Sequence, residues 1–201
     1  MSAGIRAGLA LACLLAAALP RTWLEASMLR HMLLQLPLLV AAGWLLATAL
    51  HGRSRIAAFD QHGVTGLTAL LFISAYWMIP RALELSLTEP LIETAKFLSL
   101  TALGAILPGS LRRANWIVQL FYMGNLSWMT AIAGIQYQNM PQRLCNAYLL
   151  DDQIATGAAL VCASIAIALV WGWRLHSKKE AHHVAPDPES RIDHHPGPRI
   201  L

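Results

Sequence analysis

Charged side chains are scarce in this sequence. Asp, Glu, Lys and Arg make up 13% of its 201 residues, and 56% of the residues are hydrophobic. A typical soluble domain is about 25% charged. The charges that are present fall in short clusters between long apolar runs, and a helix needs about 20 mostly apolar residues to cross a bilayer. The composition therefore predicts an all-α integral membrane protein and excludes an ordinary soluble enzyme.

Cysteine is also rare, and the three residues at positions 13, 145 and 162 are too widely spaced for a disulfide framework. Cys13 and Cys162 lie within apolar runs and are expected to be small packing residues, whereas Cys145 lies in a loop between two runs. The sequence also lacks a nucleophile elbow, a phosphate-binding glycine loop and the HExxH zinc-protease motif. We therefore expect no enzymatic activity.

The net charge of +4 does not indicate a nucleic-acid-binding protein. The basic residues lie at the ends of apolar runs and in the C-terminal segment, and they form no patch interleaved with aromatic residues. Basic residues at the ends of spans orient a protein in the membrane. We therefore expect the lipid bilayer, and no nucleic acid, among its partners.

Six apolar segments predict a bundle of six transmembrane helices over residues 1–176. The segments cover roughly residues 5–20, 29–50, 64–79, 90–107, 116–136 and 154–171. The first segment is short enough to be a signal peptide. However, Leu19-Pro20-Arg21 after it is a poor cleavage site, so we expect an uncleaved anchor.

Lys and Arg residues are distributed unevenly between alternate connections. One set of connections is almost purely basic and contains Arg6, Arg53, Arg55, Arg112, Arg113, Arg174, Lys178 and Lys179. The other set combines basic with acidic residues. Because basic connections stay in the cytoplasm, the sequence predicts a multi-pass protein of a bacterial-type cell inner membrane, with both termini cytoplasmic.

The segment 177–201 differs in composition from the rest of the chain. It is rich in proline, histidine and charged residues and has little apolar surface to bury. This composition predicts a disordered cytoplasmic tail. The histidine pairs at positions 182–183 and 194–195 could bind a metal ion loosely, although a flexible pair is more often simply solvated.

Sulfur-containing and polar side chains share one face of the second predicted span, near the outer membrane surface. Met28, His31, Met32 and Gln35 are spaced three or four residues apart, which places them on the same side of a helix. Thioether and imidazole ligands are typical of Cu(I) sites. The sequence therefore predicts a copper site with Met28, His31 and Met32, and with Asp152 at the same rim. The alternative is that Met fills packing gaps and His hydrogen-bonds a neighbour.

Glu93 and Lys96 lie one helical turn apart at the start of the fourth predicted span. One interpretation is an interfacial ion pair, with the Lys96 side chain extending outward to the headgroups. The other is a charge pair in a translocation path, because charged residues within a membrane are usually functional.

Two short segments resemble the CtaG-type cytochrome c oxidase assembly proteins. The stretch Met28-Leu-Arg-His-Met-Leu-Leu-Gln-Leu-Pro-Leu-Leu-Val resembles their His-Met-Leu-Leu…Pro-Leu-Leu segment, and Asp151-Asp-Gln-Ile-Ala-Thr-Gly resembles their Asp-Gln…Ala-Gly segment. The resemblance implies a polytopic membrane protein that helps to deliver copper to the oxidase. His31 corresponds to the family's histidine. Ser27 stands where the family usually has a second histidine, and we infer that Met28 and Met32 compensate for it.

We therefore expect an inner-membrane accessory protein of cytochrome c oxidase assembly that handles Cu(I) at the periplasmic face. It would act by ligand exchange and not by catalysis, with Asp151 and Asp152 attracting the ion or a cationic partner such as an oxidase subunit. Two alternatives stay open. One is a structural or interaction subunit of a membrane complex without a metal, and the other is a small transporter that uses Glu93 and Lys96.

Overall fold

The structure is a computed structural model that describes residues 2–50 and 60–183, and these residues form helices joined by turns and loops. The elements are α1 (Ala3–Ala18), α2 (Arg21–Glu25), α3 (Met28–Arg30), η1 (His31–Gln35), α4 (Leu36–Leu50), α5 (Val64–Trp77), α6 (Pro80–Thr88), α7 (Pro90–Arg113), α8 (Trp116–Asn139) and α9 (Leu150–His183). The predicted all-α fold class is confirmed for the described part of the chain.

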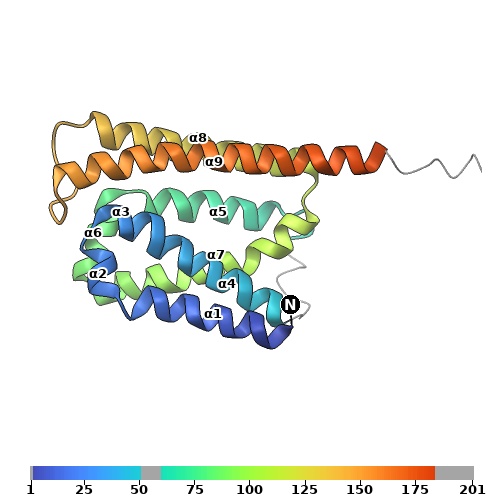
Figure 1. Ribbon diagram of the computed structural model, residues 1–201, viewed down its shortest axis with the longest axis horizontal. Coiled ribbons are helices and arrows are strands. Elements are labelled where there is room, and N and C mark those ends of the chain that lie inside the picture. The colour runs from blue at the N-terminus through green and yellow to red at the C-terminus, as the bar shows by residue number, and fades with distance from the viewer. Residues whose placement is uncertain (1, 51–59, 184–201) are drawn as a thin grey trace, which may run out of the picture.

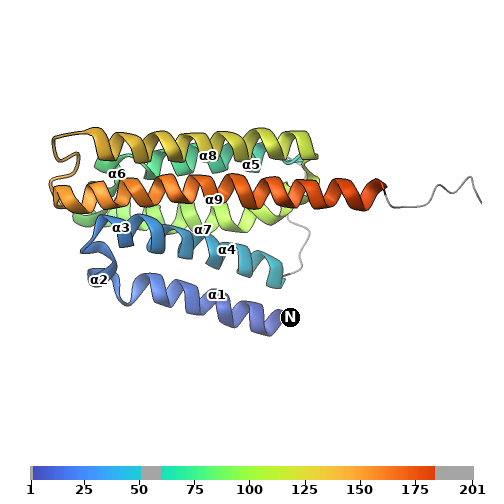
Figure 2. The same cartoon turned by 45° about the horizontal axis from the view of Figure 1, so that its top comes forward.

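The long helices lie side by side along one axis (Figures 1 and 2). The hairpin of α8 and α9 lies along one side and α1 along the other. Between them, α4 packs on both α1 and α7, and α5 packs on α7. The short helices α2, α3 and α6 gather at one end of the bundle, together with the loop 140–149 (Figure 1). We call this end the loop end.

Three stretches are long and apolar enough to cross a membrane: Met28–Leu50, Pro90–Arg113 and Leu150–Arg174. The helices α5 and α6 pass the same test as a pair but are bent by 73° relative to each other. Helix α1 is apolar but has only 16 residues, and α8 is not among the candidates because polar residues lower its hydropathy. By helix length and hydropathy the chain is a multi-pass membrane protein, with three or four candidate spans among the described residues.

The close packing of α4 on α7 depends on two glycines. A Cβ atom on Gly43 would lie 2.0 Å from the backbone oxygen of Thr101, and a Cβ atom on Gly104 would lie 2.0 Å from that of Val40. Small residues allow the backbones of two membrane helices to approach closely, which increases their van der Waals contact. The pair of glycines therefore fixes how near these two candidate spans lie.

One turn of π-helix interrupts the first candidate span. The Leu36 N–H donates to the carbonyl oxygen of His31, five residues earlier, and the π-helical turn is η1. Pro37 follows directly; it has no N–H, and its ring would clash with the carbonyl of Leu33 in a regular α-helix. The wider turn relieves this clash. As a result, both His31 and Gln35 face the interior of the bundle, where they are buried.

At the end of the bundle opposite to the loop end, the Asp60 carboxylate fixes the start of α5 against α7. Its oxygen Oδ2 accepts hydrogen bonds from Ser110 Oγ at 2.5 Å and from Arg113 Nη2 at 2.6 Å. Burial opposes ionisation of this carboxyl, but these hydrogen bonds outweigh it and hold the pKa of Asp60 below its ordinary value. Gly63, with φ of 74°, then turns the chain into α5.

Helix α9 continues to His183, beyond residue 176, where the sequence suggested that the tail begins. The rest of the predicted tail, residues 184–201, lies outside the described residues, as do Arg53 and Arg55 of the predicted cytoplasmic connection.

Candidate functional site

The Lys96 ammonium group is at the centre of a buried polar network at the loop end. Lys96 is on α7 and is 0% exposed. Its Nζ atom lies 2.9 Å from Glu25 Oε1, 3.0 Å from His31 Nε2 and 3.0 Å from Gln35 Oε1. An ammonium group has three N–H donors, so each donor has one acceptor. The interpretation in which Lys96 extends outward to the headgroups is therefore wrong.

A second basic residue connects this network to the surface. Arg21 Nε lies 2.9 Å from Glu25 Oε2, and Arg21 Nη1 lies 2.6 Å from Glu93 Oε2. Glu93 thus pairs with Arg21, and Lys96 pairs with Glu25. Burial opposes ionisation of the Glu25 carboxyl, but hydrogen bonds from Lys96 and Arg21 outweigh it and hold its pKa below the ordinary value.

Both ring nitrogens of His31 have hydrogen-bond partners. Nε2 faces the Lys96 ammonium, and Nδ1 lies 2.8 Å from the hydroxyl oxygen of Tyr148. An ammonium group can only donate, so Nε2 accepts and the neutral ring donates from Nδ1 to Tyr148. Burial also raises the pKa of the Tyr148 phenol, which keeps this hydroxyl protonated. His31 therefore links α7 to the loop 140–149 and has no free nitrogen lone pair in this arrangement.

The Asp152 carboxylate, in the first turn of α9, caps the start of α3. Its Oδ1 accepts a hydrogen bond from Ser27 Oγ at 2.8 Å, and its Oδ2 accepts one from the Met28 backbone N–H. A carboxylate at a helix N-terminus satisfies unpaired N–H groups and interacts favourably with the helix dipole. Asp152 therefore fixes α9 to α3, and it uses both carboxylate oxygens to do so.

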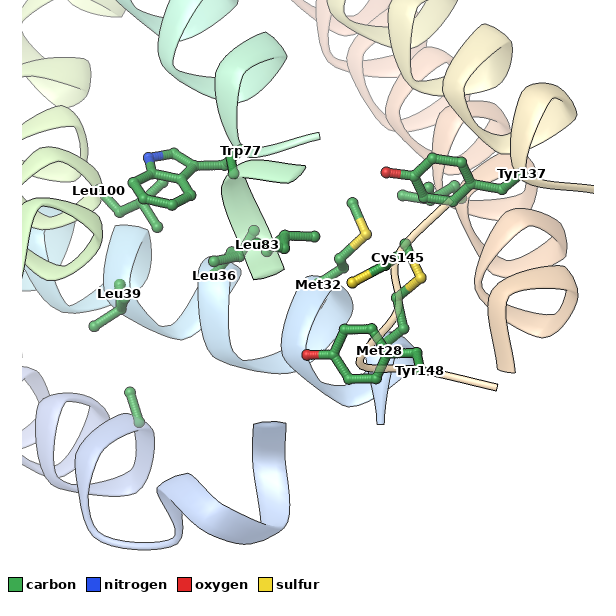
Figure 3. Close-up of a cluster of buried hydrophobic side chains, with 13 residues drawn as sticks. Met28, Met32, Leu36, Leu39, Trp77, Leu83, Leu100, Tyr137, Cys145 and Tyr148 are labelled. Carbon is green, nitrogen blue, oxygen red and sulfur yellow. The ribbon is translucent and has the colours of Figure 1, made fainter. Parts of the chain in front are cut away.

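Three sulfur-containing side chains lie in one buried cluster at the loop end. Met28, Met32 and Cys145 belong to the same group of buried residues as Tyr148. Figure 3 draws their sulfur atoms in one part of this cluster, between the first candidate span and the loop 140–149. Burial raises the pKa of the Cys145 thiol. We call Met28, Met32 and Cys145 the sulfur cluster.

The buried amide of Gln153 holds the loop beside the sulfur cluster. Its Oε1 accepts a hydrogen bond from the Leu144 N–H at 2.8 Å, and its Nε2 donates to the Tyr137 carbonyl oxygen at 3.0 Å. These bonds fix the residue before Cys145 against the end of α8. The Asp-Gln pair on which the family resemblance partly rests, Asp152 and Gln153, therefore holds two elements of the loop end in place.

The four residues predicted to bind copper all lie at the loop end, but their side chains do not converge on one point. Met28 and Met32 contribute to the sulfur cluster, whereas His31 and Asp152 are engaged in hydrogen bonds. Among the side chains that the structure describes, in residues 2–50 and 60–174, no group of three or more His, Cys, Asp and Glu is placed to hold a metal ion. Sequence reasoning missed Glu25, for which the one signal is its spacing of four residues from Arg21.

No model of a known protein family, no curated protein and no solved structure matches this chain.

Proposed function

We propose that the chain is an inner-membrane accessory protein that carries Cu(I) at the periplasmic face for the assembly of a respiratory cytochrome c oxidase. The observation that carries this proposal is the burial of Met28, Met32 and Cys145 in one cluster at the loop end (Figure 3). Thioether and thiolate ligands favour Cu(I) over harder ions. Cu(I) is the cargo, and it passes by ligand exchange, without catalysis.

The positions of the three sulfur ligands suit exchange. Met28 and Met32 belong to a continuous helical segment, whereas Cys145 lies in the non-helical loop 140–149. A loop residue can move away from its helical neighbours at lower cost than a helical residue. Cys145 is therefore the ligand that releases first when a partner offers a competing thiolate. The Cys145 thiol gives up its proton when the metal binds and recovers it on release.

The proposed topology has six spans, with the loop end periplasmic and both termini cytoplasmic. Two helices beyond the candidate spans support the higher count, because α1 and α8 run alongside the others (Figures 1 and 2) and α8, with 24 residues, is as long as α7. Helix α8 also exposes large apolar side chains, including Phe121, Trp128 and Ile132. An exposed apolar helix face of this extent suits contact with lipid.

Copper binding by the purified full chain tests the proposal. The chain is kept in detergent under anaerobic conditions, and Cu(I) is titrated against a Cu(I)-specific chromogenic chelator. We expect Met28→Leu/Met32→Leu and Cys145→Ala each to weaken Cu(I) binding by about tenfold or more, because even changes outside the ligand set can cost that much. Met123→Leu replaces a buried methionine in a different cluster and should leave the affinity unchanged.

Two further comparisons make the result decisive. Removal of residues 177–201 takes both histidine pairs, at positions 182–183 and 194–195, away from the bundle, and the proposal expects Cu(I) binding to survive this truncation. Equal Cu(I) affinity in the wild-type chain and in both sulfur variants would exclude the sulfur cluster as the site. In cells that lack the protein, the proposal also expects a copper-deficient oxidase that the wild-type chain restores and Cys145→Ala does not.

A further inference from the structure

The three acceptors around the Lys96 ammonium are each held in place by a contact that does not involve Lys96. The Gln35 side chain donates from Nε2 to the Ala17 carbonyl oxygen at 3.0 Å, which turns its Oε1 toward Nζ of Lys96. Arg21 holds the second oxygen of the Glu25 carboxylate. Each of these two acceptors therefore has a second contact that orients it independently of Lys96.

His31 is held in the same way, because its Nδ1 pairs with the Tyr148 hydroxyl and its Nε2 is left to face Lys96. His31 and Gln35 are both 0% exposed, and the Glu25 side chain is 8% exposed. A buried carboxylate with two neutral acceptors beside it favours a cation at the point where they converge, because burial deprives the carboxylate of solvation by bulk water. Glu25, His31 and Gln35 together therefore favour the binding of one cation at the point where their acceptor atoms converge.

We propose that Glu25, His31 and Gln35 form a preorganised binding site for a primary ammonium ion, and that the Lys96 side chain is its resident occupant. The three acceptors match the three N–H donors of such an ion. The ammonium also occupies the position in front of His31 Nε2 where a metal ion bound to that nitrogen would lie. The Lys96 ammonium is therefore the cation that faces His31, and it is separate from the sulfur cluster. The proposed ammonium site does not depend on copper binding.

Chemical rescue of a truncated Lys96 tests the site directly. Lys96→Ala in the full chain removes the equivalent of propylammonium and leaves the three acceptors. We expect propylammonium chloride to raise the unfolding temperature of Lys96→Ala in detergent by about 3 °C relative to an equal concentration of tetramethylammonium chloride. Tetramethylammonium has the same charge but no N–H group to donate.

The matched control is Leu100→Ala, one turn further along α7, which truncates a buried side chain that has no ring of acceptors. Leu100→Ala and the wild-type chain should respond equally to both salts. If Lys96→Ala also responds equally to both salts, or if Leu100→Ala gains as much from propylammonium, the proposed site is overturned.

A second pair of variants covers the case in which Lys96→Ala does not fold. Lys96→Met keeps most of the side-chain volume but leaves the buried Glu25 carboxylate without its ammonium partner. Adding Glu25→Gln removes that charge, so Lys96→Met/Glu25→Gln should unfold at a higher temperature than Lys96→Met alone. Because Glu25→Gln also removes the partner of Arg21, its effect in Lys96→Met is compared with its effect in the wild-type chain, where it should lower the unfolding temperature. Equal changes in the two backgrounds would show that the acceptors do not hold a cation.

Discussion

The Glu25 carboxylate joins two basic residues, Lys96 and Arg21, at the loop end. Because its pKa is lower in the folded chain than in the unfolded chain, it stabilises the fold above the unfolded pKa of about 4.3. This contribution is lost as the pH falls through the folded value. We expect the unfolding temperature to decline below about pH 4.3 and Glu25→Gln to flatten part of that decline. Glu89→Gln, which removes an exposed carboxylate, is the matched control for the loss of one acidic group.

The hydrogen bonds of His31 lead to a prediction that separates packing from copper binding. Since neither ring nitrogen has a free lone pair, His31→Gln should lower the unfolding temperature without changing the Cu(I) stoichiometry of the folded protein. The loss follows from unpaired groups left on Lys96 and Tyr148, each worth about 1–3 kcal/mol when buried. Chelator competition on the folded fraction measures the stoichiometry. Loss of Cu(I) from folded His31→Gln would show that this histidine is a ligand.

Sequence reasoning at this scale identified the polar residues but not their partners. The spacing of His31 and Gln35 correctly placed them on one face. One of the two interpretations of Lys96 had the side chain extend outward, because a lysine near the end of a span usually extends to the interface. Lys96 points inward because Glu25 pairs with it, and Glu25 lies on a short helix that the hydrophobic pattern does not reveal. A buried charge is tolerable only where such a partner exists, and the sequence gives no distance between them.

At the scale of the helix, Pro37 sets the register of the π-helical turn. Pro37→Ala restores an N–H that can bond to the Leu33 carbonyl, so a regular α-helix becomes possible. Removing the wide turn would rotate His31 relative to Leu36 by about 100°, the angle per residue of an α-helix. We expect a lower unfolding temperature in Pro37→Ala although alanine is the better helix former. Pro108→Ala, within α7, should not lower it, since no π-turn follows from that proline.

The packing of α4 on α7 makes a second prediction at this scale. Gly104→Ala would place a methyl group 2.0 Å from the Val40 backbone oxygen, and the helices must separate to accept it. We expect a loss of about 1–3 kcal/mol in the free energy of unfolding, measured by denaturation in detergent. Gly124→Ala is the control, because no atom lies within 4 Å of its added Cβ and alanine favours the helix. Equal losses in the two variants would contradict the assigned packing.

At the scale of the whole molecule, the hydrophobic pattern located the long helices well. Each of the six predicted spans corresponds to a long helix or helical segment, and the helix predicted to start at residue 90 begins at Pro90. The pattern missed α2 and α6, since helices of 5 and 9 residues carry too few turns to show a period. It also could not predict the 73° bend between α5 and α6. These short elements are the ones that build the loop end.

The orientation of the bundle in the membrane determines whether the sulfur cluster lies at the periplasmic side. Cysteines introduced at two exposed positions can measure this orientation. Asn115 lies between α7 and α8, at the end of the bundle opposite to Gln142 in the loop 140–149 (Figure 1). In a chain whose three native cysteines are replaced, we expect a membrane-impermeant maleimide to label Gln142→Cys in intact spheroplasts. Asn115→Cys should react only after the membrane is opened, because the basic Arg112 and Arg113 beside it favour the cytoplasm. The reverse pattern would turn the sulfur cluster toward the cytoplasm, where it could not deliver copper to a periplasmic oxidase domain.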